Sequence, residues 1–339
     1  MFIQKLEVLQ NQTGKKFQEI MEGLEKLESL KQDKLLTTDA IHISKGGIVL
    51  DGKPVEFTKT GFQSFTSTFG MPATYAERCI QHDKEHGTTM FLSHMDEWVK
   101  NYAQGKELLF RTYDTKNGKS RLRAVLSSRY GILDNMELVS DLDSMIKEYP
   151  LAITNSNVTS DYLNLRIAYN SPLKIGTVRG ESDVVVPALH LRNSEVGLSR
   201  VTVSIVIYRQ VCSNGMMVAG RDFQAIGKKH FGDMEINLVP ALLDSMTELP
   251  SIMDKYGDAM VNAKADVYDT PMENVFSDIF DKYTVNKSRR EAILNHFQEE
   301  EGTSRHHVIQ AITAAGRDMG DWNSRLEMEK LGTTVLLHA

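Results

Sequence analysis

The chain has few cysteines and no long apolar run. Its two cysteines, Cys79 and Cys212, lie far apart in 339 residues, so a disulfide framework is not expected and a reducing compartment is favoured. No apolar stretch reaches the roughly 18 residues that a membrane-spanning helix needs. The N-terminal residues MFIQKLEVLQNQTGKK also lack the apolar segment of a secretion signal. We therefore expect a cytoplasmic protein that has no membrane partner.

The common nucleotide-binding and hydrolase motifs are absent. Without GxxxxGK[ST], GxGxxG or GxSxG, the ATP-driven, Rossmann-type and α/β-hydrolase functions lose their main sequence support. One metallopeptidase-like pattern, H-x-x-E-H, occurs at His82, Glu85 and His86, where the two histidines could hold zinc on one helix face. Cys79 is one turn away, but no third ligand is evident, and a solvated helix end explains the same residues. The sequence predicts no cofactor and no catalytic residue.

The charges are unevenly distributed along a chain of ordinary composition. Apolar residues make up 41% and charged residues 25%, as in soluble proteins with a sizeable core. Residues 106–230 carry 17 Lys and Arg against 12 Asp and Glu, whereas residues 231–339 carry 10 against 19. The net charge of −6 therefore hides a basic middle and an acidic end. Since local charge sets the field that a polyanion meets, the middle is a candidate nucleic-acid surface, although ordinary ion pairs would explain the same arginines.

A predicted β-hairpin is the centre of this basic region. Two strand-like runs in residues 107–135 (ELLFRTYDTKNGKSRLRAVLSSRYGILDN) flank a turn that contains Asn117 and Gly118. Alternation along the strands would put Arg111, Arg121 and Arg123 on or near a single exposed face. Guanidinium groups on an open sheet face suit the binding of an anion.

The other segments predict an α+β protein with N-terminal helices, a central antiparallel or mixed sheet with a β-hairpin core, and a helical C-terminal third. A long amphipathic helix, or a pair of helices broken near Gly14, is expected in residues 2–32. A helix under an Asp or Asn cap is expected in residues 134–148. The remaining expected elements are a β-meander at 40–57, helices at 60–104, strands at 151–156, 161–169, 183–192 and 200–211, and helices from about 234 onward. Three regions follow: helices with the small meander at 1–105, a basic β-rich core at 106–232, and acidic helices packed with that core at 233–339.

The candidate binding residues are polar and cationic positions on the expected central sheet. Arginine forks suit phosphates, and tyrosine rings can stack on bases. The candidates are Arg111, Arg121, Arg123, Arg129, Tyr130, Arg166, Arg192, Asn193 and Arg200. Ordinary turn formation explains the Asn and Gly residues of segments 193–197 and 212–215 at least as well as a site does.

Three segments resemble the hallmarks of a phage- and plasmid-borne family known only as domain of unknown function 932. They are RLRAVLSSRYGILDN (121–135), LRNSEVGLSRV (191–201) and VCSNGMM (211–217), with fainter similarity at 69–75 and 311–332. The resemblance implies a mobile-element protein. A looser resemblance to phage single-strand annealing recombinases implies a β-hairpin sheet with a packed helix and a ring-forming assembly. The acidic C-terminal third departs from that second pattern.

The leading hypothesis is a non-enzymatic single-stranded DNA-binding protein of phage recombination or replication that acts as a homo-oligomer. In it Arg111, Arg121, Arg123 and Arg129 contact phosphates, Tyr130 stacks on a base, and Arg192 and Arg200 flank the same groove. The second hypothesis is an anti-defence or interaction protein whose acidic region binds a basic host protein. The third is a zinc-dependent hydrolase that uses the H-x-x-E-H residues.

Overall fold

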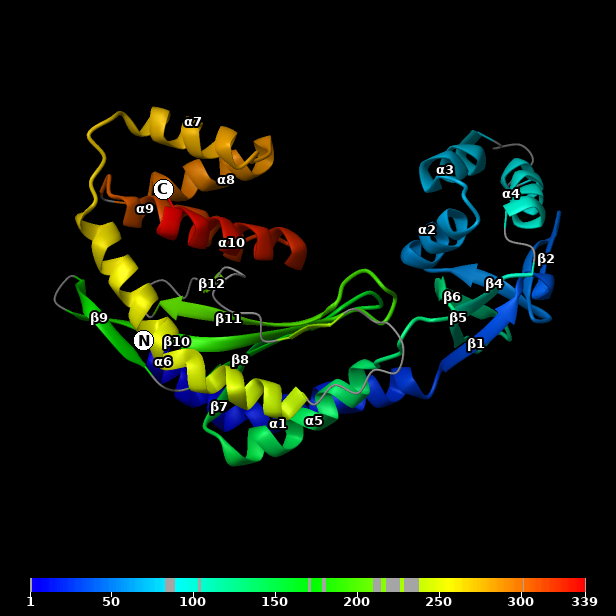
Figure 1. Cartoon of the computed structure of the whole chain (residues 1–339), viewed down its shortest axis with the longest axis horizontal. Helices are drawn as coiled ribbons and strands as arrows, with labels where there is room; N and C mark the ends of the chain where they lie inside the picture. The colour runs from blue at the N-terminus through cyan, green and yellow to red at the C-terminus, as the bar shows by residue number, and fades with distance from the viewer. Residues whose placement is uncertain are drawn as a thin grey trace.

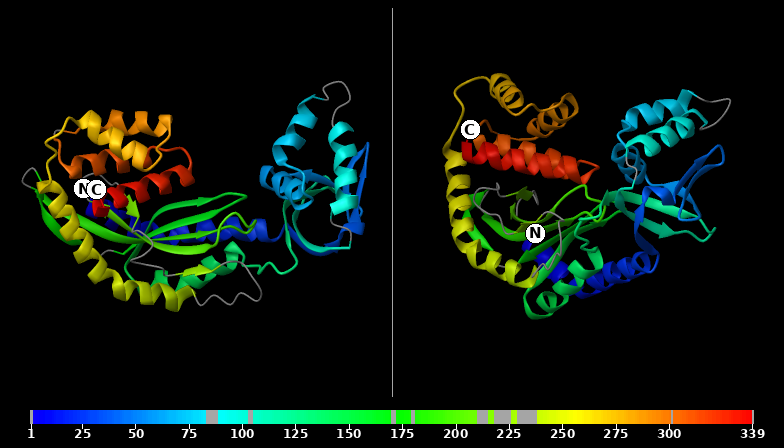
Figure 2. Two further views of the ribbon diagram at one scale, coloured as in Figure 1. Left: turned by 45° about the horizontal axis from the view of Figure 1, so that its top comes forward. Right: turned by 45° about the vertical axis from the view of Figure 1, so that its right-hand side comes forward.

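The molecule consists of two lobes arranged as a U (Figures 1 and 2). The computed structural model describes residues 2–82, 89–102, 105–169, 172–178, 181–209, 215–217, 226–228, 238–300 and 302–338. Within these residues the chain forms ten α-helices and two β-sheets, which confirms the expected α+β class. None of the described helices is long and apolar enough to cross a bilayer.

The small lobe is built on a six-stranded sheet in the order β1-β5-β6-β4-β3-β2. Its strands are β1 (Lys31–Thr37), β2 (Ile41–Ser44), β3 (Gly47–Leu50), β4 (Lys53–Phe57), β5 (Glu107–Asp114) and β6 (Ser120–Ser127). Helices α2 (Lys59–Thr68), α3 (Ala73–His82) and α4 (Thr89–Tyr102) pack on the sheet around buried Phe65, Phe69 and Met95. Helix α2 begins where the Thr58 side chain accepts a hydrogen bond from the Gly61 amide. A Cβ on Gly61 would lie 2.0 Å from the Leu122 carbonyl oxygen, so only glycine permits this helix–sheet contact.

The large lobe is built on a seven-stranded sheet, whose main order is β12-β11-β10-β8-β7. Its strands are β7 (Leu151–Val158), β8 (Leu163–Tyr169), β9 (Leu173–Val178), β10 (Glu181–Asn193), β11 (Val201–Arg209), β12 (Gly215–Met217) and β13 (Ile226–Lys228). Helices α1 (Phe2–Glu28) and α5 (Asn135–Glu148) cover one face of this sheet (Figure 1). The opposite face lies under α10 (Trp322–His338), with Ala168, Ala188 and Val206 packed against Leu326.

The C-terminal helices close the large lobe. They are α6 (Leu238–Ala265), α7 (Met272–Lys282), α8 (Lys287–Phe297), α9 (Arg305–Arg317) and α10. Helices α9 and α10 pack closely at Gly332, where a Cβ would lie 2.7 Å from the Cγ2 of Thr313. The Thr333 hydroxyl donates to the Met217 carbonyl at 2.5 Å and so ties α10 to the edge of the sheet.

Two features of the fold differ from the expectations. The expected helix at 2–32 ends at Glu28, and residues 31–37 form β1, which pairs with β5 along its whole length. The mixed charges of KQDKLLT give no period-2 signal, and the strand exists because the edge of β5 needs a partner. The 107–127 hairpin belongs to the small-lobe sheet, so the segment expected as one core (106–232) contributes to both sheets.

Candidate nucleic-acid interface

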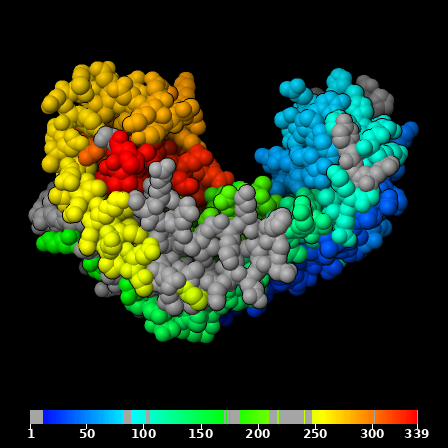
Figure 3. Space-filling view, in the orientation of Figure 1, coloured from blue at the N-terminus to red at the C-terminus, as the bar shows by residue number. Residues whose placement is uncertain are grey.

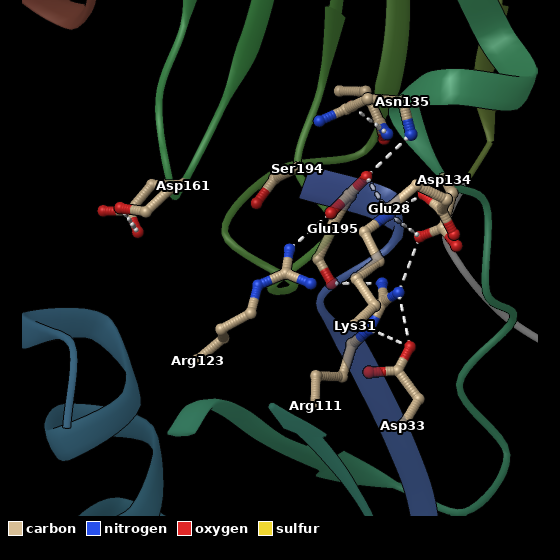
Figure 4. A network of polar contacts seen from close by, with 12 residues as sticks. Glu28, Lys31, Asp33, Arg111, Arg123, Asp134, Asn135, Asp161, Ser194 and Glu195 are labelled. Carbon is tan, nitrogen blue, oxygen red and sulfur yellow. Dashed lines mark hydrogen bonds and ion pairs between the residues drawn. The ribbon is translucent and has the colours of Figure 1, made fainter. Parts of the chain in front are cut away.

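Two of the motif-bearing segments meet at the junction of the lobes (Figure 4). The Tyr130 hydroxyl donates to the Ser194 carbonyl at 3.1 Å, and the Asn135 amide donates to Glu195 Oε1 at 2.8 Å. The Asn193 side chain donates to the Leu133 carbonyl at 3.1 Å and to Asn135 Oδ1 at 2.9 Å. These bonds fix the segment 127–135 against the loop 193–200.

A buried ion network lies directly beside these bonds. The Arg111 guanidinium contacts Asp33 Oδ2 at 2.7 Å and Asp134 Oδ1 at 2.6 Å, and it donates to the Glu195 carbonyl at 2.7 Å. Lys31 contacts Glu195 Oε1 at 2.8 Å and Asp134 Oδ1 at 3.1 Å. We call Lys31, Asp33, Arg111, Arg123, Asp134 and Glu195 the junction network.

Arg123 completes the junction network from β6. Its NH2 group pairs with Glu195 Oε2, and its guanidinium lies 4.3 Å from the centre of the Tyr113 ring. Asp134 is the N-cap residue of α5, but its side chain makes no capping hydrogen bond because it is turned toward Arg111 and Lys31. The expected Asp or Asn cap is therefore correct in position, while its side chain joins the network instead.

The junction network shifts the pKa values of Glu195, Asp134 and Lys31 in the directions that strengthen it. Burial acts to raise the pKa of Glu195, but Arg123 and Lys31 outweigh it and leave that pKa below its usual value. Burial likewise acts against Asp134, whose pKa is lowered by Arg111 and Lys31. For Lys31, burial acts to lower the pKa, and the carboxylates of Glu195 and Asp134 raise it above the ordinary lysine value. The network is therefore charged at neutral pH.

The expectation of an exposed arginine face on the hairpin is wrong. The Arg111 and Arg123 side chains are fully buried, with exposed fractions of 0% and 1%. Strand alternation indicates which residues share a face, but it does not reveal that β1 and the loop 193–197 cover that face with carboxylates. Arg121 is exposed and pairs with Glu56 of β4 at 3.1 Å.

Two further candidates on the large sheet are also buried. The Arg166 guanidinium donates to Glu329 Oε1 at 2.8 Å and to the Tyr208 hydroxyl at 3.2 Å, and its NH2 group pairs with Glu329 Oε2. Asn193 is fully buried in the bonds given above. Both side chains hold parts of the fold together, and in this conformation neither can reach a polymer.

The remaining candidates gather at one end of the large sheet. Strand β8 begins at this end, β10 finishes there and β11 starts there, with the turn after β6 packed alongside. Arg129 and Arg200 are exposed, Arg192 is half-buried 4.2 Å from the Tyr162 ring centre, and Tyr130 is half-buried with a pKa raised by burial. We call residues 127–133, 159–163 and 192–201 the cleft floor.

The cleft floor lies between the lobes. Figure 3 shows a deep notch between the C-terminal helices and the helices of the small lobe, with the central sheet at its base. At the base, the Thr60 hydroxyl of α2 donates to Asp161 Oδ2 at 2.8 Å. The loop 194–200 is shaped by Gly197, whose φ of 78° is the left-handed conformation.

Most residues of the H-x-x-E-H zinc pattern and of the turn at 212–215 lie outside the described residues. His82 is the last residue of α3, whereas Glu85, His86 and residues 212–214 are not described. Within the described parts of the chain, no three His, Cys, Asp or Glu side chains are grouped so that they could hold a metal ion.

Sequence reasoning selected the arginines of these clusters and missed their partners. Asp33, Glu195 and Glu329 were not singled out, nor was Trp322, which stacks on His190 with ring centres 5.5 Å apart. The sequence feature that could have indicated Glu195 and Trp322 was their location in segments that resemble the family. Glu195 lies within the motif 191–201 and Trp322 within the fainter segment 311–332.

Comparison with known proteins places the chain in a family. It finds no match among curated proteins or solved structures. The family model described as "Domain of unknown function (DUF932)" matches residues 123–322, which is more than half of the chain. The match includes Arg123, Asp134 and Glu195 of the junction network and the whole of the cleft floor. The chain belongs to the DUF932 family.

Proposed function

We propose that this protein binds single-stranded DNA without cleaving it, in the cleft between its lobes, and acts in recombination or replication of a phage or related mobile element in the host cytoplasm. The observation that carries the proposal is the gathering of Arg129, Arg192 and Arg200 with Tyr130 and Tyr162 on the cleft floor. Arginine forks bind phosphates, and aromatic rings stack on bases without regard to sequence. A single strand presents both groups along its length.

Two cations of the cleft floor, Arg192 and Arg200, are less neutralised than those of the junction network. Arg200 is exposed and has no ion pair within the described residues. The polar partners that Arg192 has there are neutral, namely Asn323 and the Tyr162 ring. A guanidinium that is not already paired with a carboxylate gains most from a phosphate.

The junction network supports the cleft floor from beneath. Glu195 is anchored by Arg123, Lys31 and the Asn135 amide, and Val196 beside it is buried. Leu198, two residues further on, is 47% exposed at the surface of the loop. The buried arginines therefore position the loop that carries Arg200, which is a role in binding that needs no contact with DNA.

Self-association is part of the proposal. Among the described strands, β7 is an edge of the large sheet, hydrogen-bonded to β8 on one side. A groove lined by Ile20 and Leu27 of α1 and by Val158 of β7 runs beside that edge. Side chains of α1 already bond the Ile153 backbone on this edge, so the groove beside residues 154–158 is where a second copy of the chain would fit.

Fluorescence anisotropy with a labelled oligonucleotide tests the proposal. The Arg129→Gln/Arg200→Gln double variant should bind about tenfold more weakly or worse than the wild type at about 0.1 M salt. Lys147→Gln is the matched control, because Lys147 is 73% exposed on α5, on the convex side of the U, and pairs with Asp143 at 2.6 Å. If the double variant and the control bind as tightly as the wild type, the cleft floor is not the binding surface.

The second candidate function is binding of a basic host protein by the acidic helices. The observation that favours it is the exposed acidic face of α7, which includes Glu273, Asp278 and Asp281. Under this alternative, a Glu273→Gln/Asp278→Asn variant loses the partner in a pull-down while oligonucleotide binding is absent from the wild type as well. Oligonucleotide binding that depends on the cleft floor excludes it as the main function.

A further inference from the structure

A second polar cluster lies beneath the first turns of α10. His190 pairs in register with Arg166, and Arg192 follows two residues later on β10, so the three side chains share the sheet face that α10 covers. Trp322 stacks on His190, and the Arg166 and Arg325 guanidiniums lie 5.0 and 5.3 Å from the Trp322 ring centre. The cluster adjoins the cleft floor, because Arg192 belongs to both.

This cluster holds more positive charge than its one buried carboxylate neutralises. Both carboxylate oxygens of Glu329 accept hydrogen bonds from Arg166. Arg325 also pairs with Glu329, since its Nε lies 2.9 Å from Glu329 Oε1. Arg192 is a third guanidinium, with Asn323 and Tyr162 as its neighbours. The cluster therefore has three guanidiniums and one buried carboxylate, and two of the guanidiniums contact that carboxylate.

Two N–H donors in the cluster lack partners. His190 Nδ1 accepts a hydrogen bond from Arg166 Nε at 3.4 Å, so the imidazole proton lies on Nε2. The His190 side chain is 1% exposed, and neither its Nε2 nor Arg192 Nε has a hydrogen-bond partner among the described residues. Burial, followed by the charges of Arg166 and Arg192, lowers the pKa of His190 well below its usual value, so the ring stays neutral and keeps this single donor.

An unpartnered acceptor lies on the same face. Asn164 pairs in register with Arg192, and its buried Oδ1 has no partner among the described residues. Buried polar groups in proteins are nearly always satisfied, so two donors and one acceptor without partners on one sheet face point to a ligand that brings the complementary groups. Three guanidiniums require that ligand to be anionic.

We propose that His190, Arg192 and Asn164 form a phosphate-binding site beneath Trp322. A phosphate bearing one P–OH group supplies acceptors for His190 Nε2 and Arg192 Nε and a donor for Asn164 Oδ1, whereas fully ionised sulfate has no such donor. Inorganic phosphate and a phosphomonoester share this chemistry. The site goes beyond the proposed function, because its ligand is a single phosphate group held in part by the buried side chains of His190 and Asn164, although it shares Arg192 with the cleft floor.

Trp322 provides a direct reporter for this site. The chain has two tryptophans, and Trp98→Phe removes the one in the small lobe. In that background, inorganic phosphate titrated at constant ionic strength against chloride should change Trp322 emission saturably. Arg192→Gln should raise the apparent Kd at least about tenfold, since a charge-assisted contact contributes about 1.5–3 kcal/mol. Lys147→Gln should leave it unchanged. A linear or absent response to phosphate, or a saturable response that Arg192→Gln leaves unaltered, overturns the site.

His190→Phe is the second variant. It removes the Nε2 donor and keeps an aromatic ring for Trp322 to stack on, so weaker phosphate binding with an intact thermal transition supports the site. Sulfate should bind more weakly than phosphate, and equal binding overturns the role of Asn164.

Oligonucleotides distinguish the source of the phosphate. A larger change in Trp322 emission with a 5′-phosphate oligonucleotide than with its 5′-hydroxyl counterpart assigns the source to a strand end. An equal response assigns it to free phosphate. If the protein binds the oligonucleotide but not phosphate, the phosphate site is wrong and the proposed function stands. If it binds phosphate but not the oligonucleotide, the phosphate site stands and the proposed function is wrong.

Discussion

Arg123 and Glu195 form an ion pair that is buried at the junction of the two lobes, 72 residues apart in the sequence. Their side chains are 1% and 5% exposed. The pair joins β6 of the small lobe to the loop of the large lobe that carries Arg200. Arg123, which an exposed-face prediction assigned to DNA, thus connects the two halves of the molecule through its pair with Glu195.

Removal of the Glu195 charge should destabilise the protein strongly. Glu195→Gln leaves Arg123 with an uncompensated buried charge, whereas Lys31 keeps Asp134 as a partner, and breaking a buried pair in this way destabilises by roughly 3–5 kcal/mol. Urea denaturation measures the free energy of unfolding. Glu56→Gln, which removes an exposed partner of Arg121, is the control and should change it little. Equal effects of the two substitutions would contradict the buried role of Glu195.

The junction network also predicts how stability depends on pH. The pKa values of Glu195 and Asp134 are lower in the folded protein than in the unfolded chain. Their stabilisation is therefore present above the unfolded values near pH 4 and is lost as pH falls through the folded values. The Lys31 pKa is raised, so its stabilisation is present below the unfolded value near 10.4 and is lost as pH rises through the higher folded value.

Thermal unfolding across pH checks this dependence. Stability should be level between about pH 7 and 10 and fall on both sides, because the unfolded chain protonates His190 near pH 6.5 while the folded protein keeps the ring neutral, and the junction carboxylates add to the fall at lower pH. In Asp134→Asn the acidic fall should be shallower than in the wild type. An unchanged acidic limb in that variant would mean that other carboxylates control it.

The buried carboxylate on α10 should matter more than its exposed neighbour. Glu329→Gln leaves Arg166 unneutralised beneath α10 and should destabilise the protein by roughly 3–5 kcal/mol. Glu327→Gln is the control two residues away, because Glu327 is 59% exposed and pairs with Arg289 at the surface. Hydrogen exchange should show α10 exchanging faster in Glu329→Gln than in Glu327→Gln. Equal exchange would show that α10 docks without the Arg166–Glu329 pair.

Gly197 should be needed for binding more than for folding. Gly197 and Gly118 have φ values of 78° and 76°, so alanine should destabilise by about 1 kcal/mol at either position. A Cβ at Gly197 would also lie 2.9 Å from Leu126 Cδ2, whereas at Gly118 it meets nothing within 4 Å. Gly197→Ala therefore displaces the loop 194–200 and should weaken oligonucleotide binding several-fold, while Gly118→Ala should not. Anisotropy titrations of both variants make the comparison.

Local patterns in the sequence predicted much of the fold. The 107–127 hairpin was predictable because Asn117-Gly118 and the alternating flanks agree, and α5 because its apolar residues repeat with helical spacing. Strand β1 was not predictable, since its residues gain a strand conformation from pairing with β5 rather than from a pattern of their own. Tertiary context decides such segments.

The site was less predictable than the fold because its partners are distant in sequence. Arg166 and Glu329 are 163 residues apart, and nothing near Arg166 indicates a carboxylate that will bury it. Arg200 and Arg129 are exposed, as the predicted phosphate contacts require, and each lies in a polar turn that carries little apolar surface. Alternation thus identified shared faces, and only the assembled chain showed what covers them.

The salt dependence of single-strand binding tests the central proposal most directly. The logarithm of the affinity of the wild type for a labelled single strand should fall linearly with the logarithm of salt concentration. The Arg129→Gln/Arg200→Gln variant should show a slope that is shallower by about 1.4, because each lost phosphate contact on a single strand removes about 0.7. An identical slope in the two proteins, or no binding by the wild type at low salt, would contradict the assignment of the cleft floor as a DNA-binding surface.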